Sequence, residues 1–157
     1  MPRQALRRKF LSLAWGELTA ALVFAGVYWH LWQSRGPFHG ETTGAFVVLE
    51  LLLLQGAAYW ASWALRGRRA RRRSIVTAFR ALRTINLGVL LALGVTLVLK
   101  RLPDGFAVAL AVFALVEYVN YFVIRLSFPL PDFVSRLARR NFPRSLLARE
   151  LAEQRGT

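Results

Sequence analysis

The chain has 157 residues, of which 55% are hydrophobic, and a formal net charge of +14. It contains no cysteine, which excludes disulfide bridges, thiolate zinc sites and cysteine nucleophiles. Four apolar stretches, each near the roughly 20 residues that cross a bilayer core, exclude an ordinary soluble domain and indicate a polytopic membrane protein.

The predicted elements follow in chain order. Residues 1–10 form a basic N-terminal tail, residues 11–126 hold the apolar stretches, and residues 127–157 form a second basic segment. We predict an all-α fold in which four transmembrane helices form an antiparallel bundle, followed by a short amphipathic cytoplasmic tail. The predicted spans are residues 11–32, 44–65, 75–99 and 105–126.

The first span could be mistaken for a secretory signal peptide, because basic residues precede it. Its apolar part runs for about 22 residues, which is longer than the apolar region of a typical signal peptide. It also contains Glu17 and lacks a convincing A-x-A cleavage site. We therefore expect it to be retained as an anchor.

The loops between spans set the expected orientation, because short cytoplasmic loops carry an excess of Lys and Arg. Nineteen of the 22 basic residues fall on the side of the two termini, and three fall on the other side. We expect a multi-pass protein of the inner (plasma) membrane with both termini in the cytoplasm. Arg-rich, Lys-poor usage is typical of a GC-rich bacterial source.

The second loop is a run of arginines, which we expect to contact anionic lipid headgroups. No folded module accompanies this run, so we expect no nucleic-acid partner. The arginines concerned are Arg68, Arg69, Arg71, Arg72 and Arg73.

Two prolines in "SFPLPD" end the last span, because proline lacks a backbone donor and disfavours helix before it. Residues 131–140 and 141–155 then indicate two short helices. Their apolar side chains would face lipid or the transmembrane body, or would dock another protein. These side chains are Phe133, Leu137, Leu146, Leu147 and Leu151.

Three of the eight acidic residues, Glu17, Glu50 and Glu117, lie inside predicted spans. A charge in the middle of a span costs about 2.5–3.5 kcal/mol, so these side chains should point into the bundle or toward a partner. By depth, we expect one polar cluster in the inner half of the membrane and a smaller group toward the outside. The inner cluster is Glu17, Arg83, Asn86, Glu117, Asn120 and Arg125, and the outer group is Glu50 and His30.

Helical spacing puts Glu117, Asn120 and Tyr121 on one face of the fourth span. The polar cluster could be a structural network, a transport or proton-relay site, an enzyme site, or a surface for a partner's helix. The favoured function is a small-solute or ion/proton-coupled transporter or channel. Four spans enclose little volume, so we expect a homo-oligomer.

Two other functions stay open. The first is a non-catalytic accessory or scaffold subunit that binds anionic lipid or a membrane protein partner. The second is a lipid-modifying enzyme at the inner leaflet, in which Glu117 and Asn120 would act together. The sequence contains no glycine-rich phosphate loop, HExxH helix or GxSxG motif, which favours a protein that is not an enzyme. We expect no metal and no cofactor.

Overall fold

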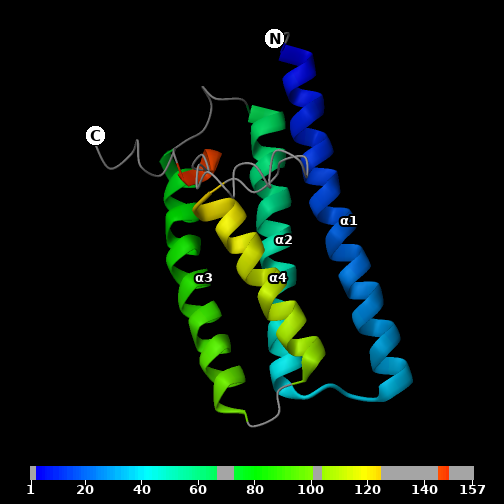
Figure 1. Cartoon of the computed structure of the whole chain (residues 1–157). Helices are drawn as coiled ribbons and strands as arrows, with labels where there is room; N and C mark the ends of the chain where they lie inside the picture. Colours follow the sequence, from blue (N-terminus) through cyan, green and yellow to red (C-terminus); the bar gives the residue numbers. More distant parts are fainter. Residues whose placement is uncertain (1–2, 67–72, 101–103, 125–144, 149–157) are drawn as a thin grey trace, which may run out of the picture.

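Figure 1 shows the computed structural model, which describes residues 3–66, 73–100, 104–124 and 145–148. The four long helices in this part of the chain are α1 (Arg3–Arg35), α2 (Gly40–Arg66), α3 (Arg73–Leu99) and α4 (Gly105–Phe122). Each is long and apolar enough to cross a membrane. The prediction of an all-α chain with four apolar helices is therefore confirmed.

Two helix ends differ from the predicted spans. Helix α1 begins at Arg3, eight residues before residue 11, because the Gln, Ala, Leu, Arg and Lys residues of this segment are good helix formers. Helix α4 ends at Phe122, four residues before residue 126. The backbone of Val123, at φ −123° and ψ −73°, has already left the helical region.

A short turn connects α1 to α2. Gly36 has a φ of +87°, a left-handed conformation that glycine adopts without steric cost, and its N–H donates to the carbonyl of Trp32. The N–H groups of Thr42 and Thr43 donate to the carbonyl of His39 at the start of α2. This turn lies at the lower end of Figure 1, and the start of α1 lies at the upper end.

Aromatic contacts pair each end of α1 with the opposite end of α2. At the upper end, Phe10 stacks on Trp60 and Trp63, with ring centroids 5.8 and 5.4 Å apart. At the lower end, Tyr28 stacks on Phe46 at 4.1 Å and shares a hydrogen bond of 2.9 Å with Thr43. The small residues Ala14 and Ala21 are buried on the same face of α1, which lets the two helices approach.

Helix α2 is the central element, since α1, α3 and α4 all pack against it. Its side chains Leu49, Leu52 and Leu53 are almost fully buried. Helix α4 approaches α2 where Gly56 lacks a side chain, because the buried ring of Tyr121 lies directly against that position. This contact sets the rotation of α4 about its own axis.

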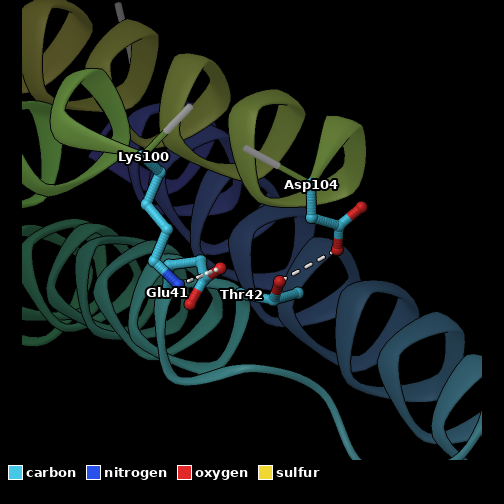
Figure 2. Close-up of polar contacts among 4 residues, drawn as sticks. All are labelled: Glu41, Thr42, Lys100 and Asp104. Atoms are coloured by element: carbon cyan, nitrogen blue, oxygen red, sulfur yellow. Dashed lines mark hydrogen bonds and ion pairs between the residues drawn. The ribbon is translucent and has the colours of Figure 1, made fainter. Parts of the chain in front are cut away.

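Two polar contacts at the lower end tie the segment between α3 and α4 to the start of α2 (Figure 2). The Lys100 ammonium lies 2.9 Å from the carboxylate of Glu41, and the Thr42 hydroxyl donates to Asp104 at 2.9 Å. Asp104 also caps α4, because its side chain accepts from the N–H of Phe106 at 3.1 Å. The first turns of α2 and α4 are thereby held together.

Residues 145–148 close the upper end of the bundle. Ser145 donates from its N–H to the carbonyl of Val123 and from its hydroxyl to the carbonyl of Tyr121. It thus satisfies carbonyls that the end of α4 leaves without a helical partner. Leu147 is 2% exposed and belongs to the hydrophobic core, so it faces the helical body. Of the other predicted tail side chains, Phe133, Leu137 and Leu151 lie outside the described residues.

The close contact between Gly56 and Tyr121 yields a stability prediction. Gly56→Ala should destabilise the fold by about 1–3 kcal/mol, because the added Cβ would overlap a ring that is buried and cannot easily move. Thermal unfolding in detergent measures the effect. Gly26→Ala in α1 is the matched control, since a Cβ there meets nothing within 4 Å. Equal stability of the two variants would contradict the packing described here.

Candidate functional site

The polar site lies between α1 and α4, on the side where both helices cover α2. No Cα atoms of α1 and α4 approach within 8 Å in the described ranges, and side chains bridge the two helices. One bridge is the edge-to-face pair of Phe24 and Phe113, with centroids 5.2 Å apart. Glu17 of α1 and Glu117 of α4 lie closer to the upper end of the bundle than these two rings do.

Glu17 lies on the face of α1 that packs against α2, between the buried residues Ala14 and Ala21. Glu117 lies beside the buried face of α4, one turn from Tyr121. Both carboxyl groups are partly buried, and they are close enough for their charges to repel each other. Two acidic groups from different helices therefore share one apolar environment.

Tyr121 and Asn120 complete this arrangement. The buried hydroxyl of Tyr121 lies close to Glu17 and Trp60. Among the described residues, none is positioned to form a hydrogen bond of normal length and angle with it. The carboxamide of Asn120 reaches the carboxyl group of Glu117, whose Oε2 atom is buried and has no hydrogen-bond partner in the part of the chain that the structure describes. Buried polar atoms without a protein partner are rare, and they commonly bind a proton, a water molecule or an ion.

The structure brings together Glu17, Glu117 and Asn120 from the predicted inner cluster, and it places Asn86 elsewhere. Asn86 donates to Gln55 at 2.7 Å, and Gln55 donates back at 3.4 Å. Helix α3 packs against α2 and α4 but not against α1, so Asn86 meets α2 instead of Glu17.

Arg83 is half-buried and makes no ion pair with either glutamate among the described residues. Arg125 lies outside the described residues, so its predicted place in the cluster stays a prediction. The same holds for the lipid-contacting arginines, of which only the backbone of Arg73, at the start of α3, is described.

The predicted outer pair does not meet. His30 is exposed, and no hydrogen bond or ion pair joins it to Glu50 within the described ranges. Tyr28 occupies the face of α1 that packs against α2, and His30 lies about 200° further around the helix. The Oε1 atom of Glu50 is buried, and no described residue forms a hydrogen bond with it.

Sequence reasoning missed three polar contacts that the fold creates: Gln55 with Asn86, Glu41 with Lys100, and Thr42 with Asp104. Gln55 carried a usable signal, because an amide in the middle of an apolar span needs a partner from another helix.

No group of three or more His, Asp or Glu side chains that could hold a metal ion occurs in the described part.

No known protein family model matches this chain, and neither a curated protein nor a solved structure resembles it significantly.

The reciprocal amide pair yields a second prediction. Gln55→Leu should lower stability by about 1–3 kcal/mol, because it leaves the buried Asn86 carboxamide unpaired. Asn86→Leu in the same chain should restore part of the loss, since both polar partners are then absent. A double-mutant cycle followed by unfolding in detergent measures the coupling between the two side chains. Additive effects of the two substitutions would contradict a direct pair.

Proposed function

We propose that this chain is a multi-pass membrane protein that carries protons, alone or coupled to a small solute, through the pair Glu17 and Glu117. The observation that carries the proposal is that two glutamates from different helices share one apolar environment, with no basic side chain beside them in the described part of the chain. Four apolar helices support the membrane location.

The chemistry follows from the shared environment. Two carboxylates that are close together in a low-dielectric medium cannot both carry a charge without a large energetic cost. A proton held between them leaves the pair with a single negative charge and removes the repulsion, and its loss creates a second negative charge that attracts a cation or another proton. The hydroxyl of Tyr121 and the carboxamide of Asn120 can orient that proton by hydrogen bonding.

The expected depth of Glu117 in the membrane supports proton exchange with the cytoplasm. Described basic residues lie at the helix ends that are uppermost in Figure 1: Arg7, Arg8 and Lys9 near the start of α1, Arg66 at the end of α2 and Arg73 at the start of α3. The excess of basic residues in cytoplasmic loops favours a cytoplasmic location for this end. Glu117 lies five residues from the end of α4, about 7.5 Å along the helix axis. Passage across the other half requires further groups, and Glu50 with a second copy of the chain would supply them.

The proton-carrying role predicts flux in proteoliposomes. Wild-type protein should dissipate an imposed pH gradient, reported by an enclosed pH-sensitive dye. Glu17→Gln and Glu117→Gln should each reduce the flux to that of empty vesicles, because an amide cannot release a proton at neutral pH. Glu41→Gln is the matched control, since it removes an acid from the lower end and should leave the flux unchanged.

Folded yield and elution from size exclusion must be measured for each of these variants. Wild-type flux no higher than that of empty vesicles would refute the proposed function. Normal flux in a well-folded Glu117→Gln variant would refute the role of the pair.

The proposed orientation predicts the location of reporter fusions. A fluorescent protein fused to the C-terminus should be bright in a bacterial host, since it folds in the cytoplasm. An alkaline phosphatase inserted at residues 36–39 should be active, because this turn would lie outside the cytoplasm. The reverse pattern of reporter activity would show that the orientation is wrong.

A further inference from the structure

An apolar groove of about 500 Å³ lies between α3 and α4, on the opposite side of α4 from the two glutamates. Its walls are aliphatic side chains, and Lys100 is the one charged residue among them. The groove exists because small residues face each other across it. Gly94 of α3 has nothing within 4 Å of an added Cβ, and Ala111 of α4 carries only a methyl group.

We propose that this groove binds one acyl chain of a phospholipid from the outer leaflet, with the lipid phosphate held at Lys100. This inference rests on the membrane insertion and orientation proposed above, but it does not depend on the Glu17 and Glu117 pair. The groove and the acidic pair lie on different sides of α4.

The length of the groove matches one leaflet. Its walls on α3 extend from Leu90 to Lys100, ten residues that rise about 15 Å along the helix. The hydrocarbon core of a bilayer is about 30 Å thick, so each leaflet contributes about 15 Å. An acyl chain that enters at Lys100 would reach the middle of the bilayer at Leu90.

The volume of the groove favours a lipid chain over a helix from another protein. A stretch of helix 15 Å long and about 10 Å wide occupies roughly 1,200 Å³, more than twice the volume available. The groove does fall within the range of about 300–1,000 Å³ that is usual for small-molecule sites. A second copy of this chain would therefore lie across the groove without filling it.

The charge at the mouth of the groove suits a phosphate. The Lys100 side chain is 48% exposed, and its ammonium group bonds to Glu41 at 2.9 Å. An ammonium group has three donors, so two are left for phosphate oxygens. Glu41 fixes the position of the ammonium group at the end of the groove (Figure 2), but its negative charge also weakens the attraction for phosphate.

Native mass spectrometry of the protein purified in mild detergent tests the proposal. The wild type should keep one phospholipid molecule per chain. Gly94→Phe should lose that lipid, because the new ring fills the groove without meeting existing atoms at its Cβ. Gly26→Phe is the matched control and should keep it, since Gly26 is likewise a helical glycine with nothing within 4 Å of an added Cβ.

Two further variants test the phosphate contact. Lys100→Gln should reduce the fraction of chains that retain lipid, while Glu41→Gln should maintain or raise it, because the negative charge of Glu41 no longer opposes the binding of phosphate at Lys100. Absence of retained lipid in the wild type, or equal retention in Gly94→Phe and Gly26→Phe, would overturn the proposal. Loss of lipid in Gly94→Phe together with loss of a dimer would assign the groove to a second copy of the chain and would also overturn it.

The cell fraction that contains the protein distinguishes a failure of the lipid site from a failure of the proposed function. Protein that stays in alkali-washed membranes but keeps no lipid refutes only the lipid site. Protein that appears in the soluble fraction refutes the membrane location, and with it both proposals.

Discussion

The contact between Gly56 and Tyr121 is the interaction on which the rest of the structure depends. A side chain on Gly56 would push α4 away from α2, and its absence lets the Tyr121 ring lie against the central helix. This contact fixes the rotation of α4. Glu117, one turn away, then faces Glu17, while Val108 and Ala111 on the other side of α4 face α3. The acidic pair and the apolar groove are thus two consequences of one close approach.

Polar contacts reinforce this packing at three levels. At the lower end, Thr42 and Asp104 join the first turns of α2 and α4. In the middle, Gln55 and Asn86 join α2 to α3, and both carboxamides use a donor and an acceptor. At the upper end, Ser145 satisfies the last carbonyls of α4. In the proposed membrane location, lipid offers no hydrogen bonds, so such contacts would select one arrangement of the helices more strictly than dispersion forces alone.

The acidic pair differs from these contacts because the described residues leave part of its hydrogen-bonding capacity unused. A carboxamide pair compensates both partners, whereas two carboxyl groups need a proton or a cation between them. Among the described residues, two buried atoms at this site have no hydrogen-bond partner, Glu117 Oε2 and the Tyr121 hydroxyl, and both belong to the same side of α4. The proposed proton-carrying role depends on this difference, whereas the Gln55 and Asn86 pair holds two helices together.

The sequence by itself determined the four apolar helices, the concentration of positive charge at one end, and the pairing of Glu117 with Asn120. These properties depend on hydropathy and helical period, which are local. Only the tertiary structure decided that Asn86 meets Gln55, that His30 faces away from Glu50, and that Leu147 enters the core. Helical spacing defines the face on which a side chain lies, but the neighbour of that face depends on which helices touch. In this chain α3 packs against α2 and α4 and never reaches α1, which no local pattern encodes.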